Sequence, residues 1–136
     1  MCGATGLGKT HLSLAIANEV IRRGYGVIYV SAPAIIAHYE NRMRQRSETD
    51  ELLDMATDCD LLIIDDLGTE IVSQFTLTAL YTLINDRVLC GKPTIISTNL
   101  TTDGISRRYN PQIASRLRGN FRRVAFVGDD IRLKKL

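Results

Sequence analysis

The chain carries near its start a glycine-rich segment that matches a phosphate-binding pattern at every specified position. Residues 3–10 read Gly-Ala-Thr-Gly-Leu-Gly-Lys-Thr, which fits G-x-x-x-x-G-K-[ST] directly before a helix-forming stretch. A bound phosphate needs a concave row of backbone N–H groups, which glycines allow because they carry no Cβ, and the helix N-terminus adds its positive end. The pattern predicts that Lys9 reaches the β- and γ-phosphates of a nucleotide and that the Thr10 hydroxyl ligates Mg²⁺. The alternative is a glycine-rich turn that matches by chance.

A second constraint is a short apolar run between two acidic residues. Residues 60–65 read Asp-Leu-Leu-Ile-Ile-Asp, a pattern typical of a strand buried on both faces of a parallel sheet. Magnesium bound to a nucleotide needs a carboxylate beside the phosphate-loop threonine, and Asp65 ends the strand where such a carboxylate would lie. Asp66 would then face the γ-phosphate and orient or deprotonate the attacking water. Alternatively, the two acids cap the turn that follows the strand.

Apolar spacing and capping residues predict that helices and strands alternate along the chain. Helices are expected over residues 9–23, 33–46, 47–57 and 74–90, and short helices follow, the second beginning at Asn110-Pro111. Strands are expected over residues 26–30, 60–65, 93–98 and 123–127. This alternation predicts an α/β fold with a parallel, doubly wound sheet, and 136 residues favour a single domain.

Composition excludes several classes of protein. With 45% hydrophobic and 24% charged residues, the chain falls among ordinary globular domains rather than disordered or collagen-like ones. No apolar run approaches the ~20 residues that span a bilayer, and the glycine-rich start lacks the pattern of a secretory signal. The three cysteines, Cys2, Cys59 and Cys90, are odd in number and far apart, which favours reduced thiols. We therefore expect a cytoplasmic protein with no membrane partner.

Charge is distributed unevenly along the chain. Residues 107–136 hold nine Lys or Arg against two Asp, a formal charge of +7, whereas the first 106 residues carry −5. A basic end suggests an anionic partner there, either nucleic acid or nucleotide phosphates. The alternative is a solvated basic face.

Two further polar residues are candidates for the same site. Asn99 follows the expected strand 93–98, where its amide could hold the attacking water, although asparagine also favours turns at strand ends. Arg116 lies in the short helix that begins at Asn110-Pro111, and an isolated arginine is usually a solvated surface charge. Spacing alone would single out neither residue.

With these motifs in order, the sequence resembles the helicase loaders of the DnaC and DnaI type, AAA+ ATPases that also resemble DnaA initiators and IstB-type transposition ATPases. The resemblance covers essentially the whole chain and is carried by residues 3–12, 60–68, 95–100 and 115–118. It implies a catalytic acid at Asp66, a sensor 1 residue at Asn99, an arginine finger at Arg116 and Mg²⁺ ligation by Thr10 and Asp65. The nucleotide-binding residues that it implies are Gly3, Ala4, Thr5, Gly6, Leu7, Gly8, Lys9, Thr10, His11 and, in the sensor 2 position, Arg132.

The resemblance also implies a function. It is that of a P-loop, AAA+ ATPase that binds ATP or ADP with Mg²⁺, assembles as a homo-oligomer on ATP, and loads the replicative helicase on single-stranded DNA. Two alternatives remain: an IstB-type helper with a transposase partner, or a nucleotide-binding remnant without turnover. In the family, the sheet order is 5-1-4-3-2 and the strand before the phosphate loop is central. Because residue 1 already adjoins that loop, we expect residues 1–136 to form a three-layer AAA+ domain that is truncated at its N-terminus. We expect this domain to lack the central strand, and the chain to lack the helicase-binding N-terminal domain.

Two segments are candidates for contact with single-stranded DNA. Ser73 and Phe75 lie where loaders line the central pore, and a phenylalanine there could stack on a base. Alternatively, Ser73 caps a helix and Phe75 packs in the core. The run Arg42-Met-Arg-Gln-Arg46 could follow a phosphate backbone or form a solvated helix end.

Overall fold

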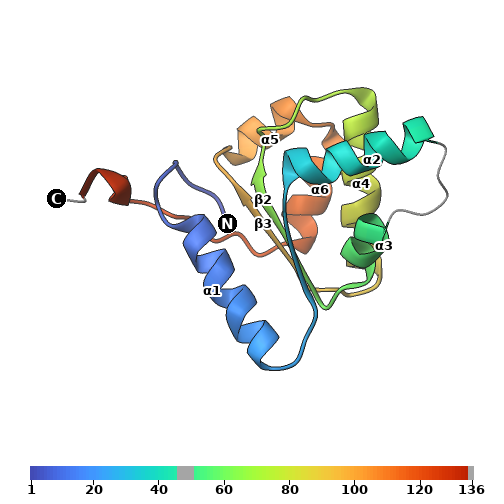
Figure 1. Cartoon of the computed structure of the whole chain (residues 1–136). Helices are drawn as coiled ribbons and strands as arrows, with labels where there is room; N and C mark the ends of the chain where they lie inside the picture. The colour runs from blue at the N-terminus through green and yellow to red at the C-terminus, as the bar shows by residue number, and fades with distance from the viewer. Residues whose placement is uncertain (46–50, 135–136) are drawn as a thin grey trace.

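The computed structural model describes residues 1–45 and 51–134 as three strands surrounded by helices (Figure 1). The elements are, in chain order, α1 (Lys9–Arg22), β1 (Val27–Ser31), α2 (Ala32–Gln45), α3 (Glu51–Asp58), β2 (Leu61–Leu67), α4 (Gln74–Leu89), β3 (Thr94–Thr98), α5 (Thr102–Arg108), α6 (Pro111–Asn120) and the 3₁₀ helix η1 (Ile131–Lys134). Strands and helices alternate, as the sequence predicts, and the fold is α/β.

The three strands form a parallel sheet in the order β1-β2-β3. Val27 of β1 lies opposite Leu61, and Leu62 of β2 lies opposite Thr94. Because the strands run in the same direction, their carboxyl ends meet at one edge of the sheet. The residues that follow β2 and β3 are therefore brought together, which is where ligands bind in open α/β sheets.

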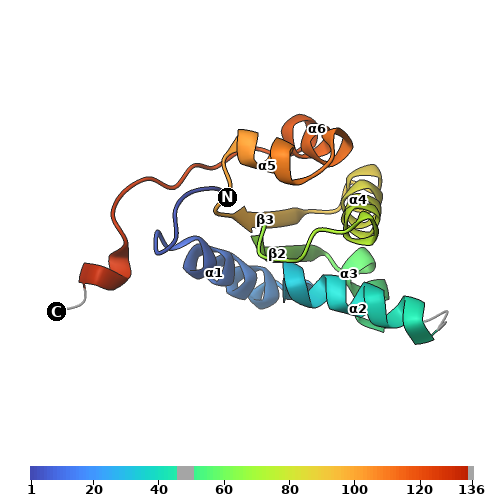
Figure 2. The ribbon, with the colours of Figure 1, turned by 90° about the horizontal axis from the view of Figure 1, so that it is seen from above.

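Helices cover both faces of the sheet, which gives three layers. Leu61 and Ile63 pack against Ala17 of α1, whereas Leu62 and Ile64 belong to a larger core formed with α2, α3, α4 and α6. This division follows from the strand geometry, since successive side chains point to opposite faces. Figure 2 shows α1 and α6 on opposite sides of β3. Within the described ranges, no helix is both long enough and apolar enough to cross a membrane.

Residues 1–3 lie as an extended stretch between β3 and the segment that follows α6. On one side, the Thr98 N–H donates to the Met1 carbonyl oxygen (3.0 Å); on the other, the Cys2 N–H donates to the Val124 oxygen (2.9 Å). Both pairings are parallel. The stretch therefore takes the central position of the expected 5-1-4-3-2 order, and of the described residues only these three occupy it.

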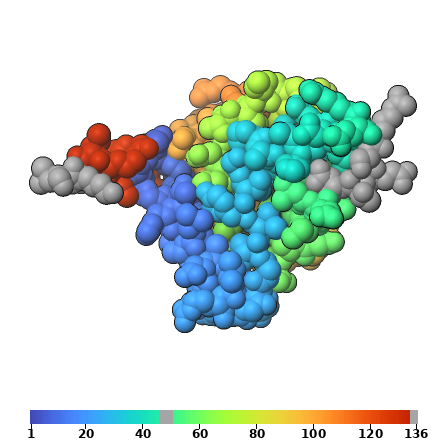
Figure 3. Space-filling model, in the orientation of Figure 1, coloured from blue at the N-terminus to red at the C-terminus, as the bar shows by residue number. Residues whose placement is uncertain are grey.

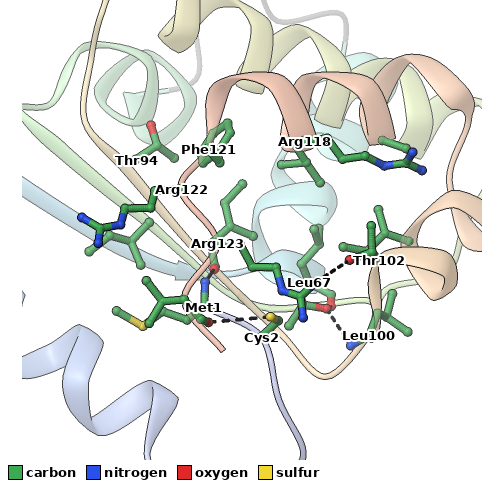
Figure 4. Close-up of a pocket in the computed structure, with 17 residues that line it drawn as sticks. Met1, Cys2, Leu67, Thr94, Leu100, Thr102, Arg118, Phe121, Arg122 and Arg123 are labelled. Carbon is green, nitrogen blue, oxygen red and sulfur yellow. Dashed lines mark hydrogen bonds between the residues drawn. The ribbon is translucent and has the colours of Figure 1, made fainter. Parts of the chain in front are cut away.

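An apolar pocket of about 380 Å³ continues this stretch along β3 (Figure 4). Its walls include Thr94, Ile96 and Leu117, and Phe121 and Arg122 lie on the side of the segment after α6. The pocket lies where a longer central strand would run, which agrees with the expectation that the sheet lacks most of this strand.

Two expected elements differ in the structure. The strand expected over residues 123–127 is wrong: Ala125 forms only an isolated bridge, because its neighbour in the sheet is a stretch of three residues. The helix expected over residues 47–57 corresponds to α3. Residues 47–50 of that expectation lie outside the described residues. Other bounds agree within about two residues, the usual uncertainty of helix ends.

Candidate nucleotide site

The phosphate-loop motif folds as a tight turn that leads into α1. Gly8 is the N-cap of α1 with φ 87°, and Gly6 has φ 78°. L side chains rarely adopt these backbone angles, so both positions require glycine. The loop curves over the first turn of α1, whose leading N–H groups have no partner within the helix. This backbone arrangement suits an anion.

The Lys9 ammonium is buried at the centre of the loop. Its Nζ atom donates to the carbonyl oxygens of Gly3 and Ala4, both at 2.7 Å, and to the Asn99 side-chain oxygen at 2.8 Å. The residue is only 5% exposed. None of these partners carries a charge, so a phosphate would be a stronger, charge-assisted partner for the ammonium. The bond from Lys9 to Asn99 joins the start of α1 to the residue after β3. The phosphate loop and the end of this strand thus meet, as the sequence predicts.

The Asp65 carboxylate is held by three hydroxyl groups. Thr10 Oγ1 donates to Oδ2 at 3.0 Å, Tyr29 donates to the same oxygen, and Ser97 donates to Oδ1. Burial alone would raise the pKa of Asp65, but the hydrogen bonds from Ser97, Tyr29 and Thr10 hold it below the ordinary value. Asp65 is thus kept ionised beside Thr10, which is the pairing expected of a magnesium site.

Asp66 has a left-handed backbone and an exposed side chain. Its φ of 55° is the only positive value among the described non-glycine residues, and it lies in an irregularity of the β2–β3 pairing. The Asp66 N–H donates to Ser97 Oγ at 3.0 Å, which holds the backbone in this conformation. Such strained residues are concentrated at functional sites. The bend turns the Asp66 side chain to the pocket side while Asp65 stays buried.

These residues surround a pocket of about 440 Å³ at the carboxyl edge of the sheet. Its described lining is Thr5, Gly6, Leu7, Gly8, Lys9, Thr10, His11, Leu14, Asp66, Asn99, Ile131 and Arg132. Gly3 and Ala4 contribute through their contacts with Lys9, and Asp65 through Thr10. The structure therefore brings together the predicted phosphate loop, both acids, the asparagine and Arg132.

The 3₁₀ helix η1 contributes Ile131 and Arg132 to one wall of the pocket. In Figure 3 it lies beside the N-terminal residues, and the Ile131 N–H donates to the Gly6 carbonyl oxygen at 3.0 Å. Arg132 forms a bidentate ion pair with Asp130, with N···O distances of 3.0 and 2.7 Å. These bonds lower the pKa of Asp130 to about 2. Arg132 is thus near the phosphate loop, paired with a carboxylate.

Arg116 lies outside this pocket, half-buried on α6. Of the candidates for contact with DNA, Ser73 caps α4 by accepting from the Thr76 N–H, and Phe75 packs against the larger core. Both observations favour the packing alternative for these two residues. Arg42 forms an ion pair with Asp54 at 3.8 Å, and Arg46 is outside the described residues.

Four of the described residues of the site were not predicted from the sequence: Leu14, Tyr29, Ser97 and Ile131. Tyr29 and Ser97 lie within strands, and the sequence signal for such residues is a polar side chain in an apolar run. Ser97, for example, follows Ile95-Ile96 and is 0% exposed. A fully buried serine in a parallel strand needs a hydrogen-bond partner, and a neighbouring Asp is the obvious one. Nothing in the sequence pattern points to Ile131.

Comparison with known proteins agrees with this geometry. Residues 1–134 match the family model described as IstB-like ATP binding protein. The chain is 29% identical to the replicative helicase loader DnaC of Escherichia coli K12 over 132 residues, which cover 96% of this chain and 54% of that protein. It is 27% identical to the replicative helicase loader DnaI of Bacillus subtilis over 108 residues, or 79% of this chain and 34% of that one.

The fold matches a solved structure as well. The AMPPCP-bound structure of DnaA from Aquifex aeolicus aligns with a TM-score of 0.82 and 27% identity, over 94% of this chain and 39% of that chain. The α/β fold is therefore that of an AAA+ P-loop domain. The chain spans about half the length of DnaC and a smaller share of the other two proteins.

The substitution Ser97→Ala tests the hydroxyl cluster around Asp65. It is expected to lower the free energy of unfolding at pH 7 by about 1.5–3 kcal/mol, because a donor to a charged, buried group is lost. Since the folded pKa of Asp65 is depressed, this stability is present above the unfolded pKa of about 3.9 and is lost as the pH falls through the folded pKa.

Urea unfolding from pH 7 to pH 3 measures this difference, which should shrink in acid. Ser106→Ala on α5 serves as the control, because Ser106 does not contact Asp65. A loss for Ser97→Ala that is independent of pH would contradict the role of this hydroxyl.

Proposed function

Because this chain belongs to the IstB-like ATP-binding protein family, we propose that it binds ATP with Mg²⁺ and hydrolyses it to ADP and phosphate. The observation that carries the proposal is the convergence of Lys9, Asn99, Asp65 and Thr10 at one edge of the sheet. The proposed ligand is supported by a structural neighbour, since DnaA from Aquifex aeolicus is described as bound to AMPPCP.

The residues beside Asp65 fit a magnesium ion. Thr10 Oγ1 and Asp65 Oδ2 are hard oxygen ligands 3.0 Å apart, and Asp65 is kept ionised although only 5% exposed. Mg²⁺ usually takes one or two such protein groups, with water and nucleotide phosphates completing its shell. When bound, it would supply positive charge beside the β- and γ-phosphates. Thr10 and Asp65 are the residues that would hold it.

In the proposed hydrolysis, a water molecule attacks the γ-phosphorus while the bond to the ADP oxygen breaks. Asp66 accepts a proton of this water, and the Asn99 amide orients the water by a hydrogen bond. Lys9 moves from the Gly3 and Ala4 carbonyls to the phosphates and stabilises the charge of the transferred group. Arg132 would reach the phosphates on leaving Asp130.

Arg116 is proposed to act on the nucleotide of a neighbouring subunit. It lies on α6 and is not among the residues that line the pocket of its own subunit. A neighbouring subunit in a homo-oligomer would receive it as an arginine finger, a group typically worth about 10³–10⁵ in rate. Turnover would then depend on assembly and be slow for the separate subunit.

The proposed biological role is that of a helicase loader in DNA replication. The names of DnaC and DnaI support this role, with the replicative helicase as the proposed partner. Single-stranded DNA is the proposed second ligand. The family description favours one competing function, an IstB-type helper ATPase with a transposase partner.

A phosphate-release assay with Mg²⁺ and ATP tests the proposed activity. Turnover supports the ATPase, whereas nucleotide binding without any released phosphate at high protein concentration would identify a binding module that lacks hydrolysis. Pull-down with purified replicative helicase or transposase then separates the two proposed partners.

The substitution Asp66→Asn is expected to keep ATP binding and to slow hydrolysis by about 10²–10⁴-fold, because a general base is lost. Asparagine tolerates the left-handed backbone of this position, so the fold should be retained. Single-turnover phosphate release measures the rate, and Asp103→Asn on α5 is the matched control. An unchanged rate in a variant that binds ATP would remove Asp66 from the mechanism.

Mixing two inactive variants tests the action of Arg116 between subunits. Lys9→Ala lacks a working phosphate loop but keeps Arg116, and Arg116→Ala has the reverse defect. The mixture should recover part of the activity, since one variant lends its arginine to the other's intact site. Arg107→Ala, an exposed arginine on α5, should remain active alone. A mixture that stays inactive while the two variants demonstrably co-assemble would refute the proposed role.

A further inference from the structure

We propose that Tyr29 is a positioning residue of the magnesium site, whose hydroxyl fixes the Asp65 carboxylate for the metal bound with the nucleotide. The proposal rests on the ATP and Mg²⁺ binding proposed above and adds a residue from β1, which belongs to neither the phosphate loop nor the acidic strand motif.

The sheet register places Tyr29 within reach of Asp65. Tyr29 lies opposite Ile63, and Ser31 lies opposite Asp65, so the tyrosine is two residues before the acid along the paired strands. Side chains two residues apart share one face of a sheet. The long side chain of Tyr29 therefore extends along the face that carries Asp65, and its hydroxyl donates to Oδ2.

The hydrogen bonds at Asp65 leave little freedom for the carboxylate. Oδ2 accepts from Tyr29 and from Thr10, and Oδ1 accepts from Ser97. An ionised carboxylate has about four acceptor positions, so these three donors leave one open. Three donors from β1, α1 and β3 thus define both the orientation of Asp65 and the direction from which a metal-bound water can approach.

The charge of Asp65 supports a cation at this position. Asp65 is 5% exposed, and within residues 1–45 and 51–134 it forms no ion pair with a lysine or arginine. Hydroxyl dipoles balance a buried carboxylate only in part. A divalent cation would supply the missing positive charge, and groups behind a metal ligand set its orientation and the affinity of the metal.

The Tyr29 hydroxyl is the donor in its contact with Asp65. A tyrosine hydroxyl has one proton to donate, and in this structure that proton goes to Asp65 Oδ2. Its side chain is otherwise weakly buried, since the residue is 39% exposed. The hydroxyl therefore makes the specific contact, and Tyr29→Phe removes it while retaining the packing of the ring.

The test compares nucleotide affinity with and without the metal. The dissociation constant of a fluorescent ATP analogue is measured with MgCl₂ and with EDTA for the wild type, for Tyr29→Phe and for Tyr25→Phe. Tyr25 is the matched control, because it lies just before β1, is 55% exposed and does not contact Asp65. In Tyr29→Phe, the gain in affinity from Mg²⁺ should fall about 10-fold or more, and the affinity in EDTA should not change.

A gain from Mg²⁺ that is equal in all three proteins would overturn the role of Tyr29. So would a lower melting temperature of Tyr29→Phe with an unchanged gain, because the hydroxyl would then only stabilise the sheet. A wild type that binds no nucleotide in either buffer would overturn the proposed function itself, and this proposal with it. Normal binding by the wild type separates the two failures.

Discussion

The geometry of the site depends on the hydrogen bonds that the buried carboxylate of Asp65 accepts. Its oxygens accept hydrogen bonds from Thr10 at the start of α1, from Tyr29 in β1 and from Ser97 in β3. A buried carboxylate without such donors would be costly, so the three elements are held against the end of β2 by the need to satisfy it. The phosphate loop is thereby fixed relative to the sheet by the same group that would face the metal.

The neighbouring position concentrates backbone strain. Asp66 adopts a left-handed φ of 55°, which costs a non-glycine residue of order 1–3 kcal/mol. Two hydroxyl groups hold this turn. Ser97 Oγ accepts from the Asp66 N–H at 3.0 Å, and Thr69 Oγ1 donates to the Asp66 carbonyl oxygen at 2.8 Å. The two adjacent acids can thus point to different places: one is buried to organise the site, and the other reaches the pocket.

The sequence predicts the motifs of this site well because each is local. The phosphate loop and the acidic strand end are each read from a few adjacent residues, whereas the role of Asn99 is implied only by the family resemblance. The parallel sheet brings all three to one edge. Contacts between strands are harder to predict, since the pairing of Tyr29 and Ser97 with Asp65 depends on register. The strand expected over residues 123–127 likewise depends on a partner far away in the sequence. That partner is only the three-residue stretch at Cys2, so a single bridge forms in place of a strand.

The central claim is that residues 3–10 bind the phosphates of a magnesium-bound nucleotide through Lys9. Calorimetric titration of the folded protein with ATP and Mg²⁺ tests it most directly, with Lys9→Ala as the variant and Lys92→Ala, whose ammonium pairs with Asp58, as the control. Saturable binding is expected for the wild type and for Lys92→Ala, and the affinity of Lys9→Ala should be at least about 10-fold weaker, because a charge-assisted contact is lost. Equal affinity of Lys9→Ala and the wild type, or no binding by the folded wild type, would contradict it.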